Sequence, residues 1–368
     1  MKTTGNRVYL YRTEVDTVEV PFERYELLGY EAMSRTEVSL PAEGTILLKP
    51  NITIPVEPQT RIITHPGFIV GLLRALMAKG VDRERLVVAE VVNGRSEEEW
   101  ARITGYAEAL APLGMKVTGL TALEGVRVEV PGAVVFDRGL VLFREVTECA
   151  FFINVPVAKC HNLSCTTFST KNLQGTVVSP QRHMCGVQEE DKALGDELAR
   201  VNGSGLSLHE ERFCHKHADA VSAIRVVGMP RLNIIDGMVG RDGTAFREGQ
   251  NHPLGWTLIG ENETHVDAVG TYLFGLDPTA TPYLRTASDR GLGANRVDRI
   301  EVVDLATGSI LGPDDLRSLR ADPPLIPLSR YSGGYYSRFR ADGTVVPWSL
   351  DHVNERRVKD GLEPIPAN

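Results

Sequence analysis

Short apolar runs that each end in a polar or glycine-rich turn constrain the fold of this chain most strongly. Such runs occupy residues 45–48, 86–89, 151–155, 232–235 and 257–259. A sheet with one solvent-exposed face shows alternating apolar and polar residues, and these runs lack that alternation. An unbroken apolar run is typical of strands buried in a mostly parallel sheet. Helical patterns lie between them, such as the apolar face from Pro66 to Met77 that Thr64 can cap. Strands alternating with helices predict an α/β fold, a mostly parallel sheet with flanking helices.

The length of 368 residues suits two domains or one large α/β domain. We predict an N-terminal α/β lobe over residues 1–145 and a second α/β lobe over residues 146–310, which carries a segment rich in Lys, His and Cys. The chain changes character after about residue 310, and a proline-rich stretch at residues 322–327 reads as extended chain. Residues 311–368 are therefore predicted to form an extended C-terminal arm.

Composition and charge argue against several classes of function. The net charge is −8, with 40 basic and 48 acidic residues and no basic stripe, so nucleic acid is not an expected partner. No apolar run reaches the roughly 18 residues of a membrane-spanning helix, and the first residues lack the apolar core of a signal peptide. With 5 cysteines, an odd number, these features predict a cytoplasmic protein without a membrane partner. Whether identical chains form a homo-oligomer stays open.

Polar residues follow several of the apolar runs. In open sheets of parallel strands, ligands bind outside the carboxyl ends of the strands. The side chains expected to gather at that rim are Lys49, Asn51, Glu90, Asn93, Lys159, His161, Asp236 and Glu261. Chains also turn at strand ends and collect polar residues there for that reason alone, so the set carries more weight than any single member.

The segment over residues 151–185 is the most informative part of the sequence. Lys159 and His161 follow an apolar strand, and a stretch rich in Ser and Thr then leads to Lys171. Hydroxyl and backbone N–H groups around a lysine suit a carboxylate or a phosphate. A lysine among apolar neighbours can have a lowered pKa, which suits a base or a covalent tether, and an imidazole can move protons near neutral pH. The plain alternative is a turn with surface lysines.

Soft metal ligands concentrate in the same half of the chain. The candidate ligands are Cys160, Cys165, His183, Cys185, Cys214, His215 and His217. Their spacing matches no standard zinc or iron–sulfur motif, and free cysteines are also common as small buried side chains. The sequence has no Walker A motif, no GxGxxG turn opening a helix and no GxSxG elbow. We therefore predict no nucleotide cofactor, and a transition metal stays an open alternative.

Several short motifs occur in a characteristic order. They occupy residues 48–51, 64–66, 104–106, 155–161, 171–175, 235–237, 265–268 and 291–293. In this order they resemble the family catalogued as domain of unknown function 362, from about residue 44 to about residue 306. Members of that family usually have an Asp-Pro pair where this chain has Glu263-Thr264-His265, and some carry an iron–sulfur segment that this sequence does not show.

A more distant likeness is to lactate racemase. It rests on His161, which precedes Lys171 by ten residues. This likeness implies that Lys171 tethers a nickel-bearing nucleotide and that His183 binds the nickel, although the spacing of His183 fits poorly.

These observations lead to one main hypothesis. We expect an enzyme that acts on a small anionic metabolite, a carboxylate or a phosphate, by Lys/His proton transfer, most simply as an isomerase or a lyase. The alternatives are a metal-binding or iron–sulfur redox protein that uses the Cys/His cluster and a non-catalytic small-molecule binding protein. The predicted catalytic residues are Lys159, His161, Lys171, Asp236 and Asp267. The predicted substrate-binding residues are Lys49, Asn51, Thr64, His65, Asn93, Thr167, Asn172, Gly237 and His265.

Overall fold

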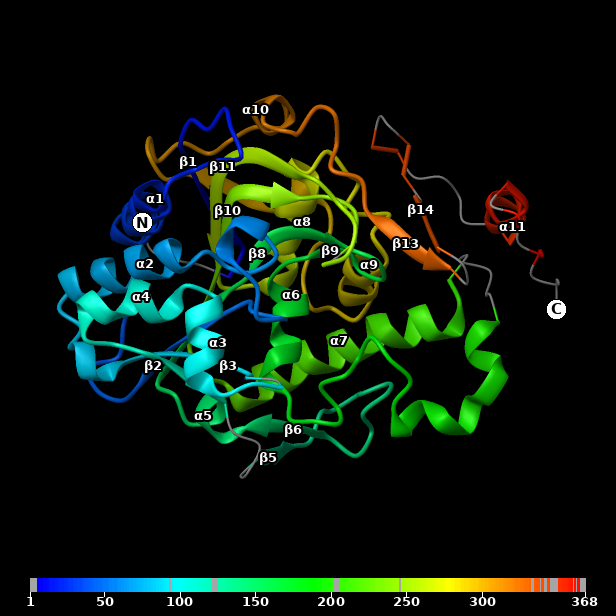
Figure 1. Ribbon diagram of the computed structural model, residues 1–368, viewed down its shortest axis with the longest axis horizontal. Coiled ribbons are helices and arrows are strands. Elements are labelled where there is room, and N and C mark those ends of the chain that lie inside the picture. Colours follow the sequence, from blue (N-terminus) through cyan, green and yellow to red (C-terminus); the bar gives the residue numbers. More distant parts are fainter. Residues whose placement is uncertain are drawn as a thin grey trace.

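The computed structural model describes residues 5–364 apart from a few short stretches. The stretches outside the description are residues 93, 121–124, 201–205, 245, 332–333, 338, 341–342, 345–349, 360 and 362. Within the described residues, strands form one mixed sheet of 10 strands, mostly parallel, with helices on its faces (Figure 1). The predicted α/β class is confirmed.

The strand order brings both halves of the chain together. From one edge of the sheet to the other it is β12 (Glu301–Asp304), β1 (Arg7–Arg12), β11 (Asn251–Gly260), β10 (Arg231–Arg241), β7 (Phe151–Val155), β2 (Ile46–Pro50), β3 (Leu86–Glu90) and β4 (Val117–Gly119), while β8 (Val157–His161) pairs with β10 and with β9 (Cys165–Thr167). β2 pairs in parallel with β7, and β1 lies between β11 and β12. These strands are hydrogen-bonded into one continuous sheet. The sheet contains strands from both sides of the predicted boundary at residue 145, so the predicted lobes 1–145 and 146–310 share this sheet.

Apolar side chains cover both faces of the central strands. In β2, Ile46 and Leu48 belong to one buried cluster and Leu47 belongs to another. Consecutive residues of a strand point to opposite faces, so a strand buried on both sides needs an unbroken apolar run. This geometry explains the apolar runs without alternation.

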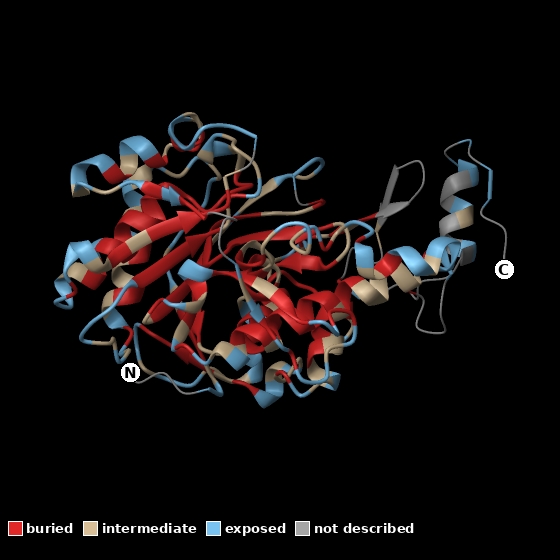
Figure 2. Cartoon of the chain, turned by 90° about the horizontal axis from the view of Figure 1, so that it is seen from below, coloured by how far each residue is buried: buried red, intermediate tan, exposed pale blue. Residues whose placement is uncertain are grey.

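Different helices bury the two faces of the sheet. α1 (Phe22–Arg35) and α2 (Pro66–Ala78) contribute to the apolar cluster on one face, whereas α7 (Leu208–Val227), α8 (Glu263–Leu273) and α9 (Pro282–Asp289) contribute to the clusters on the other. The shorter elements are α3 (Glu97–Ile103), α4 (Tyr106–Leu110), α5 (Arg144–Thr147), α6 (Ser169–Asn172), α10 (Pro313–Ser318) and the hairpin β5 (Gly125–Val128) with β6 (Leu140–Phe143). Figure 2 shows the buried residues concentrated in the sheet and along the helices beside it. None of the helices in the described part of the chain is long and apolar enough to cross a membrane.

The start of α2 differs from the prediction that Thr64 caps it. The cap is His65, whose Nδ1 accepts the N–H of Gly67 at 3.1 Å. Thr64 instead accepts the N–H of Asn51 at 2.8 Å and donates to the Val155 carbonyl at 2.7 Å. Its hydroxyl therefore joins the ends of β2 and β7, which is a structural role.

The C-terminal arm lies at the periphery of the molecule and is held by its first part. It includes α10, the hairpin β13 (Leu328–Tyr331) with β14 (Gly334–Ser337), and α11 (Leu350–Lys359). Figure 1 shows the hairpin and α11 beyond the helices that flank the sheet. The N–H of Leu325 donates to the Phe274 carbonyl at 2.9 Å, and both side chains belong to one apolar cluster. The predicted extended arm is thus anchored on the body through α8.

Candidate functional site

The carboxyl ends of two neighbouring parallel strands form the floor of the candidate site. Lys49 stands near the end of β2 and Glu90 at the end of β3. Because these strands are adjacent and parallel, the two side chains meet, and Lys49 Nζ donates to Glu90 Oε2 at 2.7 Å. The exposed fractions of the two side chains are 1% and 6%. Burial lowers the pKa of Lys49, and the charge of Glu90 counteracts part of that shift.

Two asparagines connect this ion pair to a second buried lysine. Lys159 Nζ donates to Asn51 Oδ1 at 2.7 Å and to the Ile62 carbonyl at 2.5 Å. Asn51 Nδ2 donates to Asn172 Oδ1 at 3.1 Å, and the same oxygen accepts from Lys49 Nζ at 3.3 Å. Burial, followed by the charges of Lys171 and Arg241, lowers the pKa of Lys159 to about 7. Lys159 is thus a buried ammonium close to its midpoint at neutral pH.

A ladder of asparagines fixes Asn172, and sequence reasoning missed its other two members. Asn172 Nδ2 donates to Asn154 Oδ1 at 2.8 Å, and Asn154 Nδ2 donates to Asn233 Oδ1 at 2.8 Å. Asn154 and Asn233 are paired across β7 and β10. An amide buried in an apolar strand is costly unless it is hydrogen-bonded. The isolated asparagines in the runs 151–155 and 232–235 were therefore a signal that could have pointed to this ladder.

The Lys171 ammonium contacts neutral groups. It stands in α6, and its Nζ donates to Gln174 Oε1 at 2.6 Å and lies 6.0 Å from the centroid of the Phe213 ring. Among the described residues, Lys171 takes part in no ion pair, which means that no carboxylate oxygen lies within 4.0 Å of its Nζ. An ammonium held by an amide and an aromatic ring leaves its positive charge available to an anion.

His161 packs near the same aromatic ring. Its imidazole stacks on Phe213 with the centroids 6.0 Å apart and the planes at 11°. Its Nδ1 accepts the N–H groups of Leu163 at 3.0 Å and of Ser164 at 3.3 Å, so the neutral ring carries its proton on Nε2. Burial, followed by the charge of Lys171, lowers the pKa of His161 well below its usual value. The expectation that this residue titrates near neutrality is therefore wrong, and at pH 7 it is a neutral Nε2–H donor.

These groups surround a pocket of about 230 Å³. Its basic lining residues are Lys49, Lys171 and Arg182, beside the exposed His183, and Glu90 is the acid among the described residues that line it. Gly175 permits the close approach, because a Cβ at this position would lie 2.5 Å from Lys49 Nζ. Asn51 and Asn172 also line the pocket, whereas Lys159 and His161 stand behind its wall.

The two predicted catalytic aspartates hold backbone rather than line this pocket. Asp267 of α8 accepts the N–H groups of Ser169 at 2.7 Å and Thr170 at 2.9 Å, at the start of α6. Asp236 of β10 accepts the N–H of His65 at 2.9 Å, at the start of α2. Burial raises the pKa of Asp267 to about 7 and that of Asp236 to about 6, and the backbone donors counteract part of each shift. We assign Asp267 as a positioning residue for the helix that carries Lys171.

Other predicted binding residues lie elsewhere in the fold. Thr167 is buried in β9 opposite Lys159, and Gly237 of β10 faces Trp256, whose ring a Cβ would meet at 2.3 Å. His265 stands near the start of α8, at the opposite edge of the sheet. The same holds for Glu261, because β11 runs antiparallel to β10, so the prediction that it joins the rim is wrong. Asn93 lies outside the described residues.

The candidate metal ligands do not converge. Within the part of the chain that the structure describes, no three His, Cys, Asp or Glu side chains are grouped to hold a metal ion. Cys160, Cys165 and Cys214 pack in an apolar cluster, as the plain reading of buried free cysteines predicts. His217 Nδ1 lies 2.9 Å from the Phe213 carbonyl, and His215 is half-buried on the same helix. His183 and Cys185 remain near the pocket, and Cys185 Sγ lies 3.9 Å from His161 Nε2.

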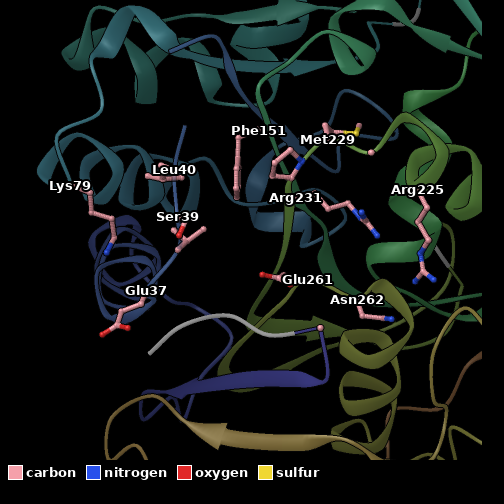
Figure 3. Close-up of a pocket in the computed structure, with 14 residues that line it drawn as sticks. Glu37, Ser39, Leu40, Lys79, Phe151, Arg225, Met229, Arg231, Glu261 and Asn262 are labelled. Carbon is pink, nitrogen blue, oxygen red and sulfur yellow. The ribbon is translucent and has the colours of Figure 1, made fainter. Parts of the chain in front are cut away.

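A larger cavity of about 1170 Å³ lies at the opposite, amino edge of the sheet (Figure 3). Figure 3 shows Arg225, Arg231, Glu261 and Asn262 around it. Both arginines pair with the buried carboxylate of Glu263, Arg225 at 3.2 Å. Glu263 offsets one of these two charges, and the lining carboxylates Glu37 and Glu261 offset the other and that of Lys79, so the charges around this cavity balance. It also lies away from the strand ends that carry the lysines. The smaller cationic pocket is the better candidate site.

Comparisons with known proteins give one family match. Residues 46–272, well over half of the chain, match the model of a family described as "Domain of unknown function (DUF362)". A search of curated proteins finds no match to the sequence. Among solved structures, a crystal structure of a protein from Thermotoga maritima aligns with 9% identity and a TM-score of 0.36 over 65% of this chain. The aligned part spans 55% of that protein's length.

Proposed function

The chain belongs to the DUF362 family, and from this premise we propose that it is an enzyme that binds a small carboxylate or phosphate and catalyses a proton transfer on it, as an isomerase or a lyase. One observation carries the proposal. Three of the nine lysines in the sequence belong to one pocket: Lys49 and Lys171 line it together with Arg182, and Lys159 contacts its lining residue Asn51 from behind. Buried positive charge is costly unless an anion compensates it.

The size and charge of the pocket indicate the class of substrate. A volume of about 230 Å³ lies below the roughly 300–1,000 Å³ of sites for drug-sized ligands and cofactors, so the substrate is a small metabolite. Lys171 and Arg182 both line this volume, and we assign the binding of the anionic group to them. Lys171 and Arg182 are half-buried, and electrostatic attraction is stronger in such a site than in bulk water.

The geometry favours Lys49 and Glu90 for the proton transfer. Both line the pocket, and burial lowers the pKa of Lys49, which brings its ammonium closer to releasing a proton. Lys159 and His161, the first candidates from sequence, do not line the pocket. Lys159 acts on the pocket through Asn51 and His161 presents a neutral N–H, so we assign both as positioning residues.

The same volume argues against a large tethered cofactor. The likeness to lactate racemase would make Lys171 the tether of a nucleotide, but a pocket of about 230 Å³ is too small for one. We therefore propose no step through such a group. We place the activity in the cytoplasm, which suits a chain whose five cysteines are all free thiols.

Proton transfer can be tested before the natural substrate is known. The purified protein is incubated in D₂O with a panel of small hydroxy- and oxo-carboxylates and sugar phosphates, and proton NMR follows the C–H signals. We expect one compound to lose a C–H signal with the wild type and to keep it with Lys49→Met. A compound that raises the melting temperature yet keeps every C–H proton contradicts the enzyme proposal and favours a binding protein. Failure of the whole panel to bind contradicts the anion site.

The lowered pKa of Lys159 predicts a pH-dependent stability. In the folded protein this pKa is about 7, against an ordinary value of 10.5. Between these two values the unfolded chain binds more protons, so the free energy of unfolding should rise with pH, by about 1.4 kcal/mol per pH unit from this group. The measurement is urea unfolding of wild type and Lys159→Met between pH 7 and 9, because other groups cancel in the difference. A difference that stays constant over this range contradicts the prediction.

A further inference from the structure

Cys185 is the one cysteine of this chain that is not fully buried. Cys149, Cys160, Cys165 and Cys214 are buried, whereas Cys185 is half-buried. Its Sγ lies 3.9 Å from His161 Nε2 and 3.9 Å from Gln174 Oε1. A thiol in contact with an imidazole and an amide, beside a cationic pocket, has the surroundings of a reactive cysteine rather than of a packing residue.

The hydrogen bonds of His161 decide which partner holds the proton. Backbone N–H groups of Leu163 and Ser164 both point at Nδ1, so the neutral ring has its proton on Nε2, toward the sulfur. Because Nε2 already carries a proton, it cannot accept the proton of the thiol, so His161 does not act as a base on Cys185. It instead points its Nε2–H toward the sulfur at 3.9 Å, while the thiol donates to Gln174 Oε1 at 3.9 Å.

Lys171 adds a charge at the same point. Its Nζ donates at 2.6 Å to Gln174 Oε1, the same oxygen that Cys185 Sγ approaches. Both Lys171 and His161 contact the ring of Phe213, which holds the ammonium and the imidazole on one platform. An anionic reagent drawn toward Lys171 therefore arrives within reach of the sulfur.

We propose that Cys185 is a nucleophilic thiol that forms covalent bonds with small carboxylates bearing an electrophilic carbon. The inference rests on the anion-binding part of the proposed function and needs no turnover. With iodoacetate as the probe, the thiol proton goes to solvent, and the thiolate then forms a bond from sulfur to the methylene carbon. The carbon–iodine bond breaks as this bond forms, and iodide leaves with the electron pair.

The experiment compares two alkylating reagents that differ in charge. The full-length protein is treated with limiting iodoacetate or with neutral iodoacetamide, and peptide mass spectrometry follows each of the 5 cysteines over time. We expect Cys185 to react at least about tenfold faster than the other four, and iodoacetate to be the faster reagent there. Lys171→Met should slow iodoacetate about tenfold, the size of one partly screened charge–charge interaction, and slow iodoacetamide less than about twofold. Cys185→Ser should remove the labelled peptide.

Several outcomes would overturn this proposal. One is labelling of Cys185 by both reagents no faster than of glutathione, and another is an iodoacetate rate that Lys171→Met leaves unchanged. Labelling that appears only after treatment with a chelator would make Cys185 a metal ligand instead. A parallel melting experiment with inorganic phosphate separates the two proposals: stabilisation by phosphate with an unreactive Cys185 ends this inference alone, whereas failure of both contradicts the anion site as well.

Discussion

Replacing Lys171 with methionine is expected to weaken the binding of small anions by about ten- to a hundredfold. Methionine keeps the length and the apolar stem of the side chain but removes the ammonium. A hydrogen bond to a charged partner contributes about 1.5–3 kcal/mol, and each 1.4 kcal/mol is a tenfold change in affinity. Lys171 is the right position for this effect, because its ammonium contacts a neutral amide and an aromatic ring.

The measurement is a titration with inorganic phosphate, followed by the melting temperature and by calorimetry. Lys192→Met is a matched control, since the Lys192 side chain is 67% exposed and pairs with Glu189 on the surface. The two variants remove the same charge from the protein, so a general change in net charge affects them equally. Equal loss of phosphate binding in both would contradict a specific site, and unchanged binding in Lys171→Met would contradict the role of this residue.

The expectation that the lysines approach one another needed only the rule that parallel strands end at the same edge of a sheet. Lys49 follows an apolar run, as does Lys159, and the parallel pairing of β2 and β7 brings their neighbourhoods together. The same reasoning was wrong for Glu261. A strand reads the same in sequence whichever way it runs, and β11 is antiparallel to β10, which sends its carboxyl end to the other edge.

The roles of the buried acids could not be predicted, because their partners are backbone groups distant in sequence. Asp267 accepts the N–H of Ser169, which lies 98 positions away along the chain, and Asp236 accepts that of His65, 171 positions away. An acid amid apolar residues signals a buried partner but not which one. Backbone N–H groups are everywhere in a chain, so only the fold identifies the ones that an acid meets.

Replacing Glu90 with glutamine is expected to lower the free energy of unfolding by about 3–5 kcal/mol, the cost of leaving one charge of a buried pair without its partner. Glu90 Oε2 accepts from Lys49 Nζ at 2.7 Å and from the Ile52 N–H at 3.2 Å, and Oε1 accepts from the Val91 N–H at 2.8 Å. Every neighbour is a donor, so the amide nitrogen of glutamine must face another donor. Urea unfolding measures the loss, and Glu84→Gln is the control, because the Glu84 side chain is 70% exposed.

A double variant shows whether the charge of Lys49 causes the loss. In Lys49→Met/Glu90→Leu both charges are absent, and the double variant should be more stable than the sum of the single effects predicts, because no charge is left unpaired.

The pH dependence of Glu90→Gln gives a second test. In this variant the lowered pKa of Lys49 falls further, since the carboxylate that counteracts its burial is gone. The unfolded chain then binds more protons than the folded protein below the ordinary lysine pKa, so the stability of this variant relative to wild type should rise with pH. If the stability effects of the two substitutions add, and if the loss of stability in Glu90→Gln does not change with pH, then Lys49 and Glu90 do not form a charged pair that stabilises the pocket.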